Sequence, residues 1–222
     1  MKADVEPSKP RRKRDPNATR LAILEAAKKV LAEDGHDALS VSRVAHIAGV
    51  NRGTAYQHFQ TREELLHATL GMVSEQLTQS VFLDPQTGEI DPTRRPVTVV
   101  VENMVKFAME NPELSRIWLF DVLSSSKPSD DKFFKLLEES TQYVVDKGYS
   151  YKDVDTEALS VIFLAGYFIW PVWVRSHARS KKDRDQMADR MTREILRLSL
   201  YGFLPPNLHP NIVSMLKEKA DD

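Results

Sequence analysis

Residues 49–66 read GVNRGTAYQHFQTREELL and combine many hydrogen-bonding side chains with two large rings, Tyr56 and Phe59. A helix in a protein core would not carry so many polar groups, and a fully solvated helix would not need the two rings. The combination is typical of a small helix that presses polar side chains against a polar partner. The residues on either side indicate what that partner is.

Helix-capping signals divide the N-terminal part of the chain into short helices. Asp15 followed by Pro16 predicts a helix start, and Gly35 predicts the end of that helix. Thr61 with Glu64 three residues later has the spacing of a capping box. The expected N-caps are Asp15, Ser40, Asn51 and Thr61, and the helices they predict cover about residues 16–33, 41–48, 52–59 and 62–82.

Tight turns join these helices, and their apolar positions match one another. Ala45 and Gly49 are small, as a close crossing of two helices requires. The pattern predicts a helix-turn-helix unit that folds around a small core. The residues expected in that core are Leu21, Ile23, Leu24, Ala27, Val30, Leu31, Val44, Val50, Ala55 and Phe59.

The composition restricts the class of protein. Apolar residues make up 41% and charged residues 28% of the 222 residues, which predicts a folded protein rather than a disordered one. The absence of cysteine excludes a disulfide framework, a thiolate metal site and a cysteine nucleophile, and it fits a cytoplasmic location. The first residues contain no apolar segment of the kind found in secretory signals.

Charge is distributed unevenly along the chain. Residues 1–62 carry 12 Lys and Arg against 7 Asp and Glu, a net charge of +5, whereas the remainder carries 19 against 25, a net charge of −6. The asymmetry predicts a polyanionic partner for the first part only. The basic run Pro10–Arg14, PRRKR, lies in a predicted arm of residues 1–14; it is either a plain solvated tail or a contact to phosphates and the DNA minor groove.

Beyond residue 83, helical periodicity continues and no alternating strand pattern is convincing. We therefore expect an all-α fold with a disordered basic arm (1–14), a helix-turn-helix domain (15–62) and a larger C-terminal helical domain for ligand binding and dimerisation (63–222). The later helices are expected at about residues 97–110, 113–124, 131–147, 156–178, 183–203 and 211–219.

Four consecutive segments closely resemble the N-terminal domain of the TetR family of bacterial transcriptional regulators. They are RLAILEAAKKVLAEDG, SVSRVAHIAGV, NRGTAYQHF and TREELL, and the resemblance covers about residues 19–68. Ala55 is a mild departure, because a larger apolar residue is common there. The resemblance implies an all-helical homodimer that binds operator DNA and releases it when a small molecule enters the C-terminal domain.

A recognition helix that enters the major groove reads base edges, while its neighbours hold phosphates. Arg52 suits guanine and Gln57 suits adenine, and Gly53 lets the backbone approach DNA closely. Tyr56 is alternatively a core ring, and His58 alternatively a bridge between helices. The DNA-binding residues predicted in this way are Ser42, Arg43, Asn51, Arg52, Gly53, Thr54, Tyr56, Gln57, His58 and Arg62.

Residues 156–178 are apolar nearly all round, so we expect a helix that is buried on every side. One side faces its own domain, and the other is expected to meet a second copy; the alternative is that both long C-terminal helices are monomer core. Predicted interface residues are Ile169, Trp173, Met191, Ile195 and Leu198, and predicted ligand-binding residues are Met104, Phe107, Trp118, Phe134, Phe163, Tyr167 and Trp170.

The apolar run at residues 161–174 is interrupted by Gly166 and Pro171, and we expect it to be too short for a helix that spans a membrane. No charge cluster is evident within these C-terminal helices, which favours a small, mostly apolar effector. The sequence predicts no membrane partner.

The histidines lack metal-ligand spacing, and no phosphate loop, nucleophile elbow or carboxylate pair is evident. We therefore expect no enzyme, metal or cofactor. The function predicted is a ligand-responsive regulator, most simply a repressor, that binds a near-palindromic operator as a homodimer. The alternative is a DNA-binding regulator that has no small-molecule effector.

Overall fold

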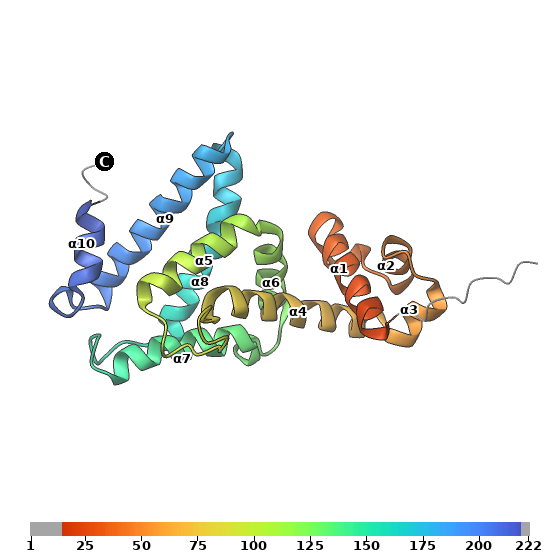
Figure 1. Cartoon of the computed structure of the whole chain (residues 1–222), viewed down its shortest axis with the longest axis horizontal. Coiled ribbons are helices and arrows are strands. Elements are labelled where there is room, and N and C mark those ends of the chain that lie inside the picture. Colours follow the sequence, from red (N-terminus) through yellow and green to blue (C-terminus); the bar gives the residue numbers. More distant parts are fainter. Residues whose placement is uncertain (1–14, 219–222) are drawn as a thin grey trace, which may run out of the picture. The chain divides into compact units, whose positions relative to one another are not determined.

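The computed structural model describes residues 15–218, and its regular elements over that range are helices, with one isolated antiparallel bridge between Leu83 and Ile90 (Figure 1). The predicted basic arm of residues 1–14 lies outside the described residues. The chain forms two compact units, one up to Thr69 and one from Leu70, so the boundary falls within helix α4 (Arg62–Phe82).

In the first unit, α1 (Pro16–Asp34), the short 3₁₀ turn η1 (His36–Ala38), α2 (Val41–Ile47) and α3 (Arg52–His58) precede α4. Three predicted caps are formed, because side-chain oxygens accept backbone N–H groups that have no partner in the first turn. Asp15 accepts from Asn17 at 2.9 Å, Ser40 from Arg43 at 3.2 Å and Asn51 from Thr54 at 2.7 Å.

The start of α4 and the turn between α2 and α3 are also fixed locally. Thr61 Oγ1 accepts from the Glu64 N–H at 3.0 Å, as the predicted capping box requires, while the Glu64 carboxylate accepts from the Gln60 N–H at 2.8 Å. Gly49 turns the chain with a φ of 64°, a conformation that side chains with a Cβ seldom adopt. Short-range signals therefore account for the shape of this unit.

The small core of the first unit is largely as predicted. Ile23, Ala27, Val44, Ala55 and Phe59 are fully buried. The prediction for Leu21 was wrong: 54% of the residue is exposed, because the buried face of α1 runs through Thr19, Ile23, Ala26 and Val30 instead.

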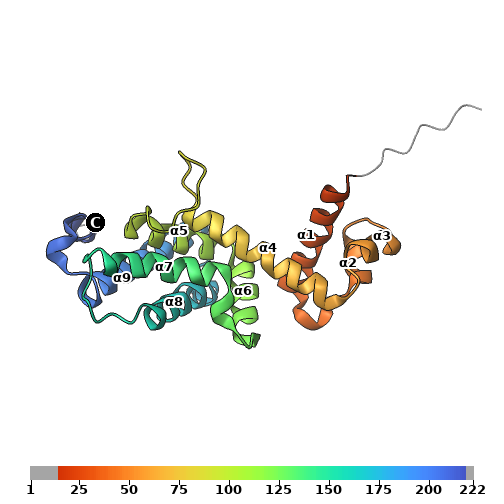
Figure 2. The ribbon, with the colours of Figure 1, turned by 90° about the horizontal axis from the view of Figure 1, so that it is seen from below.

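The second unit contains α5 (Val97–Glu110), α6 (Pro112–Ser124), α7 (Lys132–Asp146), α8 (Thr156–His177), α9 (Lys181–Gly202) and α10 (Pro210–Glu218). The 3₁₀ turns η2 (Pro128–Asp130) and η3 (Pro206–Leu208) precede α7 and α10. Helix α8 packs against α5, α6, α7 and α9, and α10 packs against α9 (Figures 1 and 2). Helix α8 is therefore central to the second unit.

Aromatic rings fill the core beside α8. The Trp118 ring lies 5.0 Å from the Phe168 ring and 5.9 Å from the Phe133 ring, measured between centroids. Phe82, at the end of α4, also packs on Phe133, with the ring centroids 5.9 Å apart. These contacts join α4, α6, α7 and α8 into one cluster.

Helix α8 continues through Gly166 and Pro171, as the predicted helix over residues 156–178 requires; the expectation that this segment is too short to cross a membrane was wrong. A buried proline removes one backbone hydrogen bond but does not end a helix that packing holds on several sides. Its 22 residues, with a mean hydropathy of 1.6 in the most apolar window, are long and apolar enough to cross a membrane, and a third of that window is buried within the chain.

Candidate nucleic-acid interface

Helix α3 turns its polar residues outward and its apolar residues inward. Ala55 and Phe59 are fully buried, whereas Arg52 and Gln57 are exposed. Tyr56 is 46% exposed, so its ring lies on the surface and not in the core. The side chains predicted to read base edges therefore share the solvent face of one short helix.

Two contacts fix the position of α3 within its unit. The Arg20 guanidinium of α1 lies over the Phe59 ring, 4.4 Å from its centroid. The Ser42 and Tyr56 hydroxyls are 3.5 Å apart, at the limit of a hydrogen bond between α2 and α3. The helix that carries the exposed polar face is thus anchored to α1 through the Phe59 ring.

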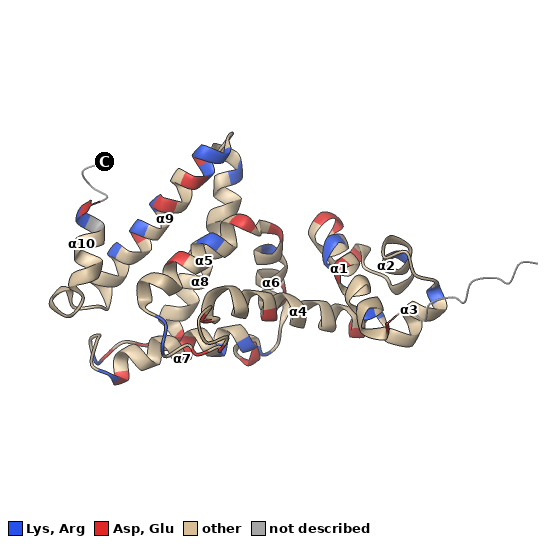
Figure 3. Cartoon of the chain, viewed as in Figure 1, with Lys and Arg blue, Asp and Glu red and all other residues tan. Residues whose placement is uncertain are grey.

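Helices α2 and α3 contain no acidic residue, as their sequences VSRVAHI and RGTAYQH show. Figure 3 marks acidic and basic residues along the ribbon. The backbone N–H groups of the first turn point out of the N-terminal end of each helix, and they give that end a partial positive charge. Helices α2 and α3 therefore place no carboxylate on this surface, which fits the predicted contact with phosphate.

Gly53 lies within α3 and has no positive φ. A Cβ added there would meet only the Asn51 side chain, at an ordinary contact distance of 3.5 Å. Because alanine would fit and would favour the helix, the fold itself does not require glycine at this position.

Two arginines that were predicted to contact DNA form hydrogen bonds or an ion pair within the protein. Arg62 donates to the backbone carbonyls of His36 at 2.8 Å and Leu39 at 3.2 Å, and so joins the start of α4 to the connection between α1 and α2. Arg43 pairs with Asp34 at 2.6 Å. These contacts and the Arg20 stacking were not predicted, because each joins residues from different elements of the unit.

Of the remaining predicted residues, Asn51 caps α3 and is exposed, and Thr54 and His58 are half-buried. The structure brings Ser42, Asn51, Arg52, Gly53, Thr54, Tyr56, Gln57 and His58 onto α2, α3 and the turn between them. Arg43 and Arg62 lie on α2 and α4 in the same unit.

The predicted interface residues of the second unit divide into two groups. Ile169, Trp173 and Leu198 are 56%, 57% and 54% exposed. Ile195 is buried and Met191 is half-buried, and both lie against Gly166 of α8, where an added Cβ would meet Met191 at 3.4 Å and Ile195 at 3.9 Å. Ile195 therefore packs mainly within its own chain.

Two of the predicted ligand-binding residues, Phe163 and Tyr167, line a cavity of about 50 Å³ between α5, α7, α8 and α9. Trp118 belongs to the aromatic core, and Trp170 donates its indole N–H to the Met187 carbonyl at 3.0 Å. Met104, Phe107 and Phe134 are buried and do not line this cavity.

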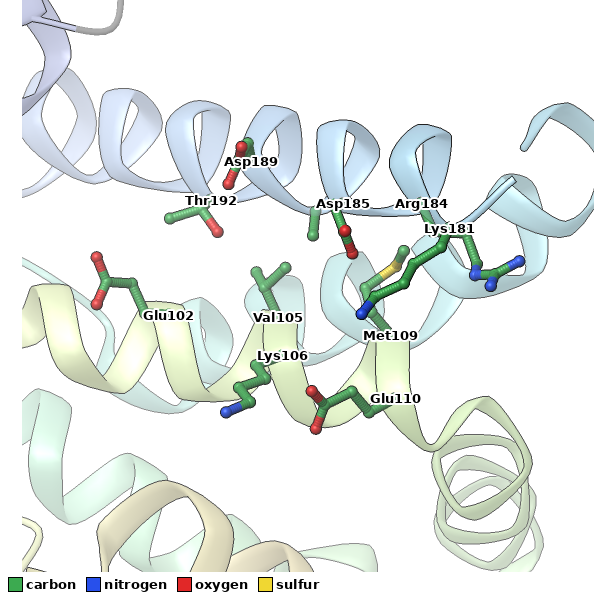
Figure 4. A pocket seen from close by; sticks show the side chains of 11 residues that line it. Glu102, Val105, Lys106, Met109, Glu110, Lys181, Arg184, Asp185, Asp189 and Thr192 are labelled. Atoms are coloured by element: carbon green, nitrogen blue, oxygen red, sulfur yellow. The ribbon is translucent and has the colours of Figure 1, made fainter. Parts of the chain in front are cut away.

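A larger groove of about 460 Å³ lies between α5 and α9 (Figure 4). Its walls include Lys106 and Glu110 from α5 and Lys181, Arg184 and Asp185 from α9. The prediction that these helices contain no charge cluster was wrong, because the charges come from two helices distant in the chain, which folding brings face to face. Among residues 15–218, no group of three His, Asp or Glu side chains is placed to hold a metal ion.

Residues 23–69 match the family model described as bacterial regulatory proteins, tetR family. The HTH-type transcriptional regulator TtgR of Pseudomonas putida is 32% identical over 82 residues, which cover 37% of this chain and 39% of TtgR. The chain thus matches about two fifths of the length of that relative.

Solved structures extend the likeness in fold to most of the chain. The ketosteroid transcriptional regulator KstR2 of Mycobacterium tuberculosis aligns with a TM-score of 0.55 at 19% identity, over 85% of this chain and 96% of KstR2. AibR in complex with isovaleryl coenzyme A and operator DNA aligns with a TM-score of 0.57 at 19% identity, over 78% of this chain and 96% of AibR. These matches show that residues 23–69 form a TetR-family helix-turn-helix domain and that most of the chain shares the fold of the solved regulators.

Proposed function

We propose that this protein is a cytoplasmic, ligand-responsive transcriptional repressor that binds a near-palindromic operator as a homodimer. The observation that carries the proposal is the exposed face of α3, where Arg52, Tyr56 and Gln57 point to solvent while Ala55 and Phe59 anchor the helix. Side chains of these types read guanine and adenine edges and hold phosphates when such a helix lies in the major groove.

Dimerisation is supported by an apolar strip on the C-terminal hairpin. The strip consists of exposed large side chains that fall on one side of α8 and on one turn of α9. Its residues are Val161, Ile162, Ile169, Val172, Trp173, Leu198 and Tyr201, each at least 54% exposed. A soluble protein seldom leaves so many large apolar side chains uncovered, so a second copy is the proposed cover.

A bilayer is the other surface that would cover α8. Helix α9, which packs against α8, carries charged residues on almost every turn, including Asp185, Arg190, Glu194 and Arg197. Lipid around α8 would contact these side chains, and charges in the bilayer interior are costly. A second copy leaves them in water, which favours the dimer.

The effector is proposed to be small and mostly apolar. The cavity lined by Phe163 and Tyr167 supports this, and KstR2 is described as a ketosteroid transcriptional regulator. If the effector releases DNA, it must bind the DNA-free form better, and operator must weaken effector binding by the same factor. The alternative, a regulator without an effector, is favoured by the small volume of about 50 Å³.

Selection from a randomised DNA pool with the full chain tests the proposal. We expect enrichment of near-palindromic sites whose half-site centres lie about one helical turn apart or more. A mobility shift with the selected site then separates a DNA-binding protein from any other class. Enrichment of no sequence, or of unpaired single half-sites, would contradict the proposed dimeric regulator.

A further inference from the structure

Two cavities of the second unit share a wall. The buried cavity, of about 50 Å³, includes Phe163 and Tyr167 in its lining. The vestibule, of about 240 Å³, lies between the start of α5, the end of α7 and the segment η3–α10. Val97 and Val144 line both, so the two spaces adjoin across these two side chains.

The Tyr167 hydroxyl is a polar group in the lining of a largely apolar cavity. Tyr167 is 3% exposed, and burial, with no hydrogen bond contributing, sets the pKa of its hydroxyl. Two other hydroxyls of the same lining are bonded within their helices, since Ser199 donates to the Ile195 carbonyl at 2.7 Å and Thr141 to that of Leu137 at 2.9 Å. Burial raises the pKa of Tyr167, so the hydroxyl remains a hydrogen-bond donor.

A buried donor without a partner costs about 1–3 kcal/mol, and such groups are usually paired in folded proteins. A ligand oxygen in the buried cavity would remove that cost. The hydroxyl therefore selects a ligand with an oxygen acceptor inside an otherwise apolar environment.

The vestibule, unlike the apolar cavity, is suited to a negatively charged group. Pro96, Val97 and Thr98 belong to the start of α5, and Asn211 and Ile212 belong to the first turn of α10. Helix α5 has no side-chain cap, so its first-turn N–H groups make the positive end of a helix dipole. In α10, Pro210 has no N–H and the Ile212 and Val213 N–H groups donate to the His209 carbonyl, so the Asn211 N–H is the first-turn donor that remains. The lining contains no Asp or Glu, so a negative charge there meets two helix N-termini and no carboxylate.

His209 adds a polar ring and ties the vestibule wall in place. Its Nε2 donates to the Tyr149 carbonyl at 2.5 Å, and the two rings lie 6.4 Å apart in an edge-on arrangement. This bond connects the turn before α10 to the chain that follows α7. The ring thus stands in the vestibule wall, next to the start of α10.

We propose that the buried cavity and the vestibule together bind an amphipathic carboxylate that carries one further oxygen along its chain. The carboxylate lies in the vestibule against His209 and the first turns of α5 and α10. The apolar chain passes between Val97 and Val144, and the second oxygen accepts from Tyr167. This ligand class rests on the proposed function only in that the ligand is to act as the effector.

The head group is tested by calorimetric titration of the full chain with octanoate and octylamine, which share a chain length and differ in charge. We expect octanoate to bind at least about tenfold more tightly. Asn211→Asp places a carboxylate in the vestibule at a helix start, where the fold tolerates it, and should reverse the preference. Asn207→Asp, an exposed change outside the lining, is the matched control and should leave it unaltered.

Equal binding of octanoate and octylamine, or an unchanged preference in Asn211→Asp, would overturn the carboxylate assignment. His209→Gln is a second test of the carboxylate assignment, because it removes the imidazole but retains a donor for the Tyr149 carbonyl. We expect it to weaken octanoate several-fold, while His177→Gln, on the exposed end of α8, should not.

The second oxygen is tested with 5-, 6- and 7-oxo-octanoate against octanoate. We expect one of the oxo acids to bind the unaltered chain about tenfold more tightly than octanoate, and Tyr167→Phe to abolish that advantage without weakening octanoate. If no oxo acid binds better, or if Tyr167→Phe retains the advantage, the role of Tyr167 is refuted.

Operator binding measured on the same samples separates this site from the proposed function. A carboxylate that binds with the expected preference but leaves operator affinity unchanged supports the site and contradicts its role as the effector site. Operator binding without any carboxylate preference contradicts the site alone.

Discussion

The exposed side chains of α3 are polar, whereas those of the strip on α8 and α9 are large and apolar. In the first unit, the apolar residues of α3 face inward and its hydrogen-bonding groups face solvent. In the second unit, Trp173 and Leu198 are more than half exposed while charged side chains line the groove between α5 and α9. The two surfaces call for different partners, one polar and charged, the other apolar.

The first prediction removes the apolar partner. Leu198→Glu places a charge in the proposed dimer interface twice, once in each copy, and a buried unpaired charge costs about 3–5 kcal/mol. We expect a monomer in analytical ultracentrifugation and loss of specific operator binding. Leu123→Glu, at an exposed leucine of α6, is the matched control and should remain dimeric. A dimer that survives Leu198→Glu would move the interface elsewhere.

The second prediction concerns the polar partner. Arg52→Ala should weaken specific binding by about 1–3 kcal/mol and relax the preference at one base pair, because a guanine contact is lost. Competition binding against a set of single-base operator variants measures both effects. Arg94→Ala, in a loop of the second unit where Arg94 pairs with Asp91, is the control. Uniform weakening across all operator variants would show that Arg52 holds phosphate and does not read a base.

Removal of residues 1–14 should give the complementary result. This segment carries the basic run PRRKR, and the loss of phosphate contacts weakens binding to all sequences alike. We expect a lower slope of binding affinity against salt concentration and an unchanged base preference. The same salt slope in the truncated and full chains would leave the arm as a plain solvated tail.

The parts of the fold that could be predicted are those that depend on interactions between residues close in the sequence. The limits Val97–Glu110 were predicted to the residue, and each cap in the first unit depends on neighbours within three positions. Helix α9 begins at Lys181 and not at residue 183, because the Ser180 hydroxyl and the Asp183 carboxylate form a capping box that was not recognised.

Contacts between distant residues account for what was missed. Arg62 has the composition of a phosphate ligand, yet His36 and Leu39, which accept its hydrogen bonds, cannot be identified from spacing. The charged groove was missed for the same reason, because its charged residues come from both α5 and α9. Which residues stand on α3 was predictable from the sequence; which arginines remain free to contact DNA depends on the packing around them.

The fourth prediction separates what the fold needs at position 53 from what the DNA partner needs there. Gly53→Ala should stabilise the protein by about 0.5–1 kcal/mol, since the added Cβ meets only ordinary contacts and alanine favours a helix. It should nevertheless weaken operator binding, because the methyl group separates the α3 backbone from DNA. Gly71→Ala in α4, where nothing lies within 4 Å of the added Cβ, should stabilise similarly and leave binding unchanged. Thermal unfolding and mobility shift measure the two effects, and parallel behaviour of both variants would remove the case for close approach.

The smallest effect concerns the start of α9. Backbone hydrogen bonds from Arg179 and Ser180 hold the pKa of Asp183 below its ordinary value of 3.8. A carboxylate with a lowered pKa in the folded state contributes stability that is present above the unfolded pKa and is lost as pH falls through the folded pKa. Asp183→Asn should therefore lower the unfolding temperature slightly at pH 7, and the difference from the unaltered chain should shrink as pH falls below about 4. Unfolding curves at both pH values measure it, with Asp185→Asn, on the same helix but outside the capping box, as the control. A difference that stays constant or grows in acid would show that the charge of Asp183 does not stabilise the start of the helix on which the proposed dimer depends.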